Sequence, residues 1–521
     1  MREPNLLAKQ FARELGIVRA ARDRDHAKAE AAKNLHVSTT GAGLTLLYEN
    51  LRNASENAEE NLLLQRAIKR FFKRVYLTPD INNLKDIGSE LVTELTLAGY
   101  LKNDSVSIDT VNQISQIAID YTKLRNKLIS RFPGNTVERW TTEPMSAAIE
   151  SKLLDHRLSL AFADFAYSYF LSAIDVNSFF GGKRPNSYEA TLFVAVCSAL
   201  LKSDPSAIRL SLLTRYQISL AKAPDFAKFN MQIDQVFNSS ALKRLVHLID
   251  RHGAAFRIIL RAMNSNDKLD QHLLSEKSFL GPYDAAISES YTTISRNINR
   301  GIVRSVIFLV ITKFIIGIAA EVPYDLMIHG KVIWLALIVN LFTPPLYMIA
   351  LRLTLSMPNP SNTRALHREA VRILYEPVPT KPFLGRRTGN KFGKGYNAIY
   401  SLLVIVVFAG VAYALVRFAR FEWVHLIIFF VFISTASFLG FRLSRSIREI
   451  EVGEEAQTGV TMVRDFFYMP FVAVGQRVSE TYAQINSVSR MLDMLVELPL
   501  KTILGFLRKW GSFLSAKKDS F

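Results

Sequence analysis

Four long apolar runs in the second half of the chain limit what it can fold into. They cover residues 302–322, 332–351, 398–416 and 423–441. Each has about 20 residues, the length that an α-helix needs to cross a hydrocarbon layer about 30 Å thick. Because short connections pair the first run with the second and the third with the fourth, the sequence predicts four transmembrane helices arranged as two hairpins.

The basic residues beside these runs predict the orientation of the helices, since Lys and Arg are retained on the cytoplasmic side. The chain opens on a charged, Ala-rich stretch without an apolar signal-peptide core, so we expect the N-terminus to lie in the cytoplasm. The inner flanks then carry fifteen Lys or Arg residues, nine of them from Arg352 to Lys394, whereas the outer connections carry Lys331, Arg417 and Arg420. We therefore predict a multi-pass protein of the cell inner (plasma) membrane with both termini in the cytoplasm.

Aromatic residues agree with this orientation, because Trp and Tyr favour the membrane interface. Those near the predicted outer ends are Tyr324, Trp334, Tyr413 and Trp423. The two arginines between the third and fourth runs leave one alternative open, in which these runs form a re-entrant pair and their connection stays inside.

The composition narrows the class of protein further. The chain has 521 residues, 49% of them hydrophobic, with 64 Lys and Arg against 46 Asp and Glu and a formal charge of +18. This excludes an acidic disordered chain, and the single cysteine excludes a disulfide scaffold and a thiolate-rich zinc site. Much of the positive charge lies beside the apolar runs, so the bilayer explains it better than nucleic acid does.

The remaining residues predict helices, and the expected fold class is all-α. Apolar residues between 38 and 299 recur every three or four positions, as in Ile87, Leu91 and Leu95, with expected breaks at Pro133-Gly134 and Gly281-Pro282 among others. The predicted order is a basic N-terminal segment (1–37), a cytosolic helical domain (38–299), a first transmembrane hairpin (300–352), a basic Pro/Gly-rich cytoplasmic loop (353–397), a second hairpin (398–441) and a cytoplasmic tail of amphipathic helices (442–521).

One predicted helix of the cytosolic domain has a basic stripe opposite an apolar one. The basic stripe consists of Arg66, Lys69, Arg70, Lys73 and Arg74. A basic amphipathic helix can bind anionic lipid or the phosphates of nucleic acid. We favour the simpler interpretation of a core helix with a solvated outer face, because every surface helix needs a polar face.

Two other basic segments are candidates for contact with anionic lipid headgroups. A juxtamembrane basic cluster gains about 1 kcal/mol per residue near an anionic leaflet, and a basic amphipathic helix with Trp at its boundary can lie in the headgroup region. The candidates are Arg386, Arg387, Lys391 and Lys394 in the loop and Lys501, Arg508, Lys509 and Trp510 in the tail.

Polar residues inside the apolar runs are the remaining candidates for a functional site: Lys313, Asn340, Pro344 and Pro345. A Lys in mid-membrane costs about 2.5–3.5 kcal/mol and should find a partner, for which we expect Asn340 and carbonyls freed where the prolines kink or interrupt the helix. The group is either an ion or substrate site or, as we favour, a satisfied network that fixes the packing of the first hairpin. We find no acidic residue deep in a run, which argues against a proton-coupled pathway.

Small residues in the third and fourth runs predict close helix packing. Gly410 and Ala414 lie four apart on one run, and Ala436 and Gly440 on the other. They could pack these two helices together or join two chains in a homo-oligomer.

No combination of residues predicts catalysis, and we expect neither an enzyme nor a cofactor. His247, Asp250 and His252 are the nearest approach to a metal site, but the two histidines are five apart and do not share a helix face as a zinc-binding pair would. Cys197 lies in an apolar stretch, where a thiol is usually an inert core residue.

Three short stretches between residues 48 and 70 carry a resemblance: Tyr48-Glu49-Asn50-Leu51-Arg52-Asn53, Glu59-Glu60-Asn61-Leu62-Leu63 and Arg66-Ala67-Ile68-Lys69-Arg70. Together they resemble a segment of uncharacterised membrane proteins of reduced-genome, candidate-phylum bacteria. The resemblance implies residence in a bacterial inner membrane and no particular activity.

Three functions follow as hypotheses. The first is a membrane-anchored interaction platform or scaffold for unidentified protein partners. The second is an oligomeric small-solute or lipid transporter or channel subunit, and the third is a membrane-tethered contact for nucleic acid or the ribosome, which we expect least.

Overall fold

A computed structural model describes most of the chain. The described residues are 2–38, 43, 46, 49, 63–76, 85–182, 184, 185, 187–355, 357–378, 394–452 and 468–478, without the side chains of 26, 29–31, 354 and 394–398. Within these residues the fold is all-helical, as the sequence predicts, and an isolated bridge between Asn34 and Ser107 is the sole β-contact.

The described chain forms two compact units. We call one the long-helix unit; it contains the described residues of Met1–Asn5, Ile174–Gly182 and the described residues from Asp250 onward. The other, the N-terminal helical unit, contains the described residues of Leu6–Ala173 and Lys183–Ile249. The boundaries expected at residues 37 and 299 therefore both fall inside a unit.

The N-terminal helical unit is a bundle of helices. Their bounds are α1 (Leu6–Ala31), α3 (Leu63–Val75), α4 (Ile87–Leu97), α5 (Ile108–Leu128), α6 (Gly134–Trp140), α7 (Thr142–Leu153), α8 (Arg157–Ala173), α10 (Tyr188–Val196), the π-helix η3 (Cys197–Leu201), α11 (Pro205–Arg215), α12 (Ala223–Phe237) and most of α13 (Ser240–His252).

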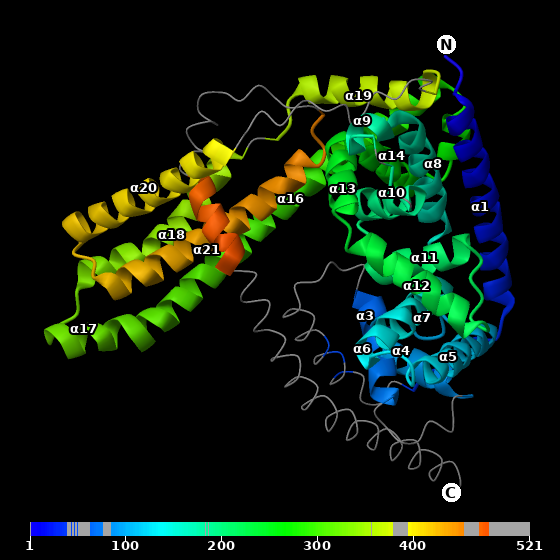
Figure 1. Ribbon diagram of the computed structural model, residues 1–521, viewed down its shortest axis with the longest axis horizontal. Helices are drawn as coiled ribbons and strands as arrows, with labels where there is room; N and C mark the ends of the chain where they lie inside the picture. The colour runs from blue at the N-terminus through cyan, green and yellow to red at the C-terminus, as the bar shows by residue number, and fades with distance from the viewer. Residues whose placement is uncertain are drawn as a thin grey trace, which may run out of the picture. The chain divides into compact units, whose positions relative to one another are not determined.

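Helix α1 belongs to the core of this unit, although the sequence predicted only a basic segment there. Its side chains Ala8, Phe11 and Leu15 are buried, and the ring of Phe11 stacks on Phe165 of α8 with 4.5 Å between centroids. Figure 1 shows α1 lying beside α8. The apolar face of α1 is therefore closed by its own unit.

The long-helix unit contains the extended helices and the elements around them. Their bounds are α9 (Val176–Phe180), α14 (Ala254–Ser265), α15 (Leu269–His272), α16 (Glu276–Ile316), the π-helix η4 (Gly317–Glu321), α17 (Val322–His329), α18 (Trp334–Thr354), α19 (Pro360–Tyr375), α20 (Lys394–Ala419), α21 (Trp423–Arg448) and an unlabelled helix over 468–478.

Four helices of this unit are long and apolar enough to cross a membrane, at the positions of the four apolar runs. They are Glu276–His329, which joins α16, η4 and α17, then Trp334–Leu353, Ile399–Ala419 and Trp423–Arg448. Many of their large apolar side chains are exposed, among them Phe314 at 59% and Phe418 at 78%. A lipid environment would cover such surfaces, which is compatible with a membrane protein.

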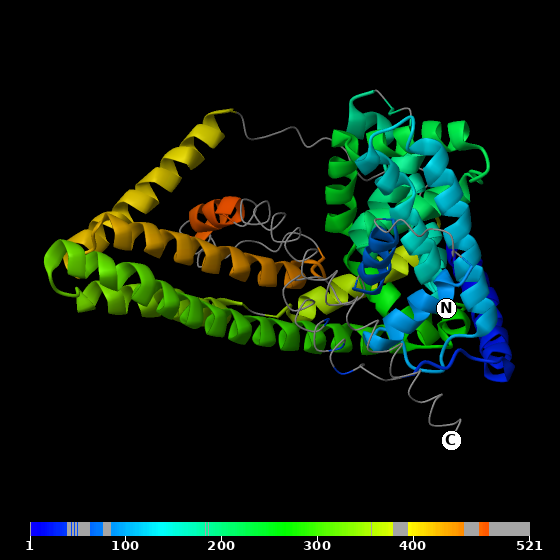
Figure 2. The same ribbon diagram turned by 90° about the horizontal axis from the view of Figure 1, so that it is seen from below.

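Three of the long helices pack together and the fourth contacts them less. Helices α16, α18 and α21 run side by side around Ile302, Leu309, Met348 and Ala436 (Figures 1 and 2). Figure 2 shows α20 leaving this group at an angle from its connection to α21. Only 6% of the apolar window of α20 is buried, so the described residues leave most of its surface uncovered.

One prediction about prolines is wrong, because the expected break at Gly281-Pro282 lies inside α16. Pro344 and Pro345 lie inside α18 and do not interrupt it, and the alternative of a kink stays a prediction. A proline removes one helix hydrogen bond and clashes with the preceding turn, at a cost of about 3 kcal/mol. In α16 the burial of Phe279 and Tyr283 on either side of Pro282 offsets this cost.

Candidate functional site

Lys313, Glu321 and Asn340 form what we call the charged centre, inside the three packed long helices. The Nζ of Lys313 donates to Asn340 Oδ1 at 2.6 Å and to Glu321 Oε1 at 3.2 Å, and it lies 4.6 Å from the centroid of the Phe432 ring. Asn340 Nδ2 donates to the same Glu321 oxygen at 2.9 Å. All three polar side chains are at most 1% exposed, so they interact with protein and not with solvent.

The π-helix η4 explains how Lys313 and Glu321 come to face each other. In a regular α-helix, residues eight positions apart differ by about 80° around the axis. One wide π-turn takes up a residue, so this angle falls to about 20°. The two side chains therefore project from the same face of one continuous helix, towards Asn340 on α18.

A second buried pair lies one helical turn further along, formed by Asp325 of α17 and His425 of α21. Asp325 Oδ2 accepts from the backbone N–H of Ile333 at 2.8 Å, and its Oδ1 lies 3.4 Å from His425 Nε2. Asp325 is 1% exposed and His425 is fully buried. Asn340 Nδ2 also donates to the His425 carbonyl oxygen at 3.4 Å, so Asn340 connects this pair to the charged centre.

The same end of the helices carries a partly exposed polar group. Glu422, in the connection between α20 and α21, accepts from the Tyr324 hydroxyl at 2.8 Å and pairs with His329 Nε2 at 2.7 Å. The Tyr324 hydrogen bond lowers the pKa of the Glu422 carboxyl below its usual value, and the neighbouring His329 acts in the same direction. Glu422 is therefore a partly exposed carboxylate close to the buried Asp325–His425 pair.

Several atoms of the buried residues have no hydrogen-bond partner among the described residues. They are Glu321 Oε2, Asp325 Oδ1 and both ring nitrogens of His425. Buried polar groups in folded proteins are nearly always hydrogen-bonded, and an unsatisfied one costs about 1–3 kcal/mol. Hydrogen bonds among the described residues therefore leave four buried atoms of this network unsatisfied.

The sequence located part of this site and missed the rest. Lys313 does bond to Asn340, as expected, and Pro344 and Pro345 are buried on the following turn of α18. Glu321 lies near the end of the first apolar run and Asp325 lies beyond it, so neither is deep in a run, yet both side chains are buried in the fold. The sequence signal that could have identified them is their spacing of four residues, which places two carboxylates one helical turn apart on the same face of a helix.

The basic stripe of α3 faces carboxylates of its own unit. Arg74 pairs with Glu94 at 2.5 Å and Lys73 with Glu138 at 2.7 Å. The other described pairs are Arg70 with Glu49 and Lys69 with Glu143. The apolar stripe, including Ile68 and Phe72, is buried. These contacts suit a core helix, although its outer face is ion-paired and not simply solvated.

The predicted lipid contacts mostly lie outside the described residues. This holds for Arg386, Arg387, Lys391, Lys501, Arg508, Lys509 and Trp510. Lys394 begins α20, and its side chain is likewise not described. Their proposed contact with anionic headgroups stays a prediction.

The two pairs of small residues lie in different surroundings. Ala436 is fully buried against α16 and α18, and a Cβ at Gly440 would lie 1.9 Å from Leu351 Cδ2 of α18. This face of α21 is therefore occupied by α18 and not by α20. Among the described residues nothing lies within 4 Å of a Cβ added at Gly410, and Ala414 is exposed, so the predicted contact with a second chain through this pair stays a prediction.

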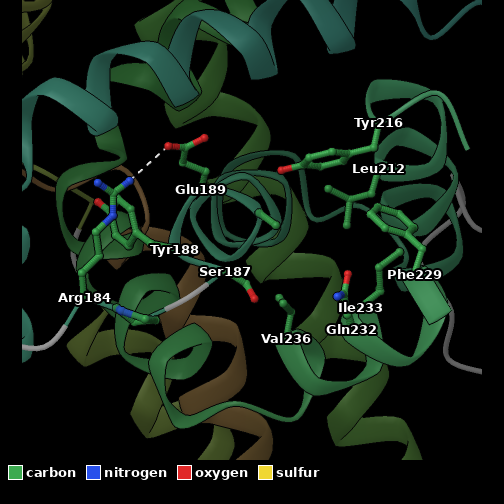
Figure 3. Close-up of a pocket in the computed structure, with 12 residues that line it drawn as sticks. Arg184, Ser187, Tyr188, Glu189, Leu212, Tyr216, Phe229, Gln232, Ile233 and Val236 are labelled. Carbon is green, nitrogen blue, oxygen red and sulfur yellow. Dashed lines mark hydrogen bonds and ion pairs between the residues drawn. The ribbon is translucent and has the colours of Figure 1, made fainter.

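The N-terminal helical unit has an open depression of about 580 Å³ between α10 and α12 (Figure 3). Arg184 pairs with Glu189 at 3.1 Å on one side and lies over the ring of Tyr188. On the other side the rings of Tyr216 and Phe229 are 5.3 Å apart. The depression thus combines a charged edge with an aromatic edge, as protein-binding surfaces often do.

Neither metal binding nor thiol chemistry has support in the described part of the chain. No group of three His, Cys, Asp or Glu residues there is placed to hold a metal ion. Cys197 is buried, as predicted, and burial raises the pKa of its thiol to about 12, so it is almost wholly protonated at neutral pH.

Comparison with known proteins gives no relative: no family model matches the chain, and no curated protein or solved structure is significantly similar to it.

Proposed function

We propose that this is a multi-pass protein of the inner (plasma) membrane whose N-terminal helical unit is a cytoplasmic interaction platform. The observation that carries this proposal is the combination, in one chain, of four long helices with exposed apolar faces and a separate compact unit that buries its own core. The excess of Lys and Arg beside the predicted inner ends supports a cytoplasmic location for both termini.

The depression between α10 and α12 is the proposed contact surface of the platform. Its aromatic edge offers apolar area and its Arg184–Glu189 edge offers charge. Tyr216 is 45% exposed at this surface, whereas Leu160, 42% exposed on α8, does not line it. These two positions make a matched pair for a test.

A photo-crosslinking amino acid would replace Tyr216 or Leu160 in the full-length protein in native membranes. We expect discrete protein adducts at position 216 that decrease when Arg184→Glu is added, and weak, nonspecific labelling at position 160. Equal labelling at both positions, or adducts indifferent to Arg184→Glu, would contradict the proposed surface.

A second candidate function is that of an oligomeric small-solute or lipid transporter subunit. The charged centre favours it, because ionisable residues within membrane helices commonly mark substrate or ion sites. Uptake that is lost in a folded Lys313→Met protein would support transport. Unchanged uptake of every tested solute on overexpression and deletion would count against it.

The basic stripe of α3 lends no support to the third hypothesis, a nucleic-acid contact. Lys69, Arg70, Lys73 and Arg74 each pair with a carboxylate, and these carboxylates compete with phosphates for the same charges.

A further inference from the structure

We infer that Asp325, His425 and Glu321 form a proton-binding site within the long-helix unit. The inference goes beyond the platform and does not require that a solute be transported. It rests on the placement of four buried ionisable side chains: these three and Lys313.

The charge of this group is the first argument. Lys313 supplies one positive charge, Glu321 and Asp325 supply two negative charges, and neutral His425 supplies none. All four side chains are at most 1% exposed, so the group holds one negative charge too many in surroundings that solvate charge poorly. One bound cation would make the group neutral, and a proton is the smallest.

Geometry identifies where that proton would reside. Lys313 and Asn340 both donate to Glu321 Oε1, so the charge of Glu321 already has partners. Asp325 Oδ1 accepts no hydrogen bond from the described residues, yet it lies 3.4 Å from His425 Nε2. A proton on Nε2 would turn that nitrogen into a charged donor facing the excess carboxylate.

The unpartnered oxygen of Glu321 gives the proton a second position. Glu321 and Asp325 are four residues apart along one helix, where side chains are neighbours. In the charging step, a hydronium ion gives its proton to His425 or to Glu321 Oε2 and leaves as water. No electrons are transferred and no other bond breaks.

Titratable groups on the neighbouring helices also surround His425. Lys313 on α16 opposes additional positive charge, while Glu321 and Asp325 on the same long helix attract it. Tyr324, His329 and Glu422 lie at the exposed end, and Glu422 is paired with the other two. Arg417 in the last turn of α20 and Arg420 on the connection before α21 are both exposed, where solvent screens them.

The test follows the ring nitrogens of His425 by NMR during a pH titration. The sample is the full-length protein, ¹⁵N-labelled at histidine, in lipid nanodiscs, and His425→Gln assigns the resonance. We expect the ring of His425 to take up a proton within the pH range in which the protein is folded. Asp325→Asn should lower its protonation midpoint by about 1–3 pH units, the usual effect of removing a close opposite charge.

Two further variants keep the test decisive. Glu321→Gln should lower the midpoint by a smaller amount, and it serves if Asp325→Asn fails to fold. Glu289→Gln, which changes an exposed carboxylate of α16, should leave it unchanged. A His425 that stays neutral wherever the protein is folded would overturn the inference, as would a midpoint indifferent to both carboxylate variants or a site that responds to sodium and not to pH.

Discussion

The ion pair of the charged centre gives the sharpest stability prediction. Lys313→Met removes a cation that makes two hydrogen bonds, to Asn340 and Glu321, and one contact with the Phe432 ring. A hydrogen bond to a charged group contributes about 1.5–3 kcal/mol and a desolvated cation–π contact about 2 kcal/mol. Because the buried ammonium also regains its solvation on unfolding, the net loss should be about 3–5 kcal/mol, the usual cost of breaking a buried pair.

A double-mutant cycle separates the pair from its surroundings. Glu321→Gln keeps the shape and the acceptor for Asn340 but leaves Lys313 without a counter-charge, so it too should destabilise the protein. Lys313→Met with Glu321→Gln removes both charges and should lie within about 1 kcal/mol of wild type.

Reversible unfolding in mixed micelles, followed by circular dichroism, would measure these free energies. Single variants as stable as wild type, or a double variant showing the sum of both losses, would refute the argument that the pair is buried and coupled.

Two other predictions follow from packing and from burial. Gly475→Ala would place a Cβ 2.1 Å from the backbone oxygen of Ser434, so it should destabilise the contact between helix 468–478 and α21 by about 1–3 kcal/mol. In the same unfolding assay the control Gly410→Ala should be neutral or stabilising, because no described atom lies within 4 Å of the added Cβ. Burial raises the pKa of Glu150 on α7 to about 7, so the folded state binds a proton more tightly than the unfolded state and stability should fall as pH rises from about 4.5 to 7. Glu150→Gln should flatten that decline and add on the order of 2–3 kcal/mol at pH 8; an unchanged pH profile of thermal unfolding would contradict the assignment.

Helix type and the positions of the long apolar segments could be predicted from the sequence, because both depend on local patterns. A run of about twenty apolar residues followed by a short polar connection can be recognised from a short stretch of the sequence alone. Helix continuity at Pro282 was not predictable in this way, because it depends on the burial of Phe279 and Tyr283 against distant residues.

For the candidate site too, the sequence reveals the residues that stand out locally but not those brought together by long-range packing. Lys313 and Asn340 stand out because each is polar within an apolar run. Glu321 lies one residue before the end of the first apolar run and Asp325 lies beyond it, and only the π-turn and the packing of α21 bring them to Lys313 and His425. Similarly, the ion pairs of the α3 stripe involve carboxylates up to 74 positions away, which no periodicity reveals.

The membrane topology on which the proposed cytoplasmic platform depends can be measured directly with single-cysteine variants. Cys197, the one natural cysteine, is buried and its thiol is protonated, so it should give little background. We predict that a membrane-impermeant maleimide labels Lys331→Cys and Arg420→Cys in intact spheroplasts, and labels Arg364→Cys only after the membrane is opened. Labelling of Arg364→Cys in intact spheroplasts, or protection of Lys331→Cys, would contradict the proposed arrangement.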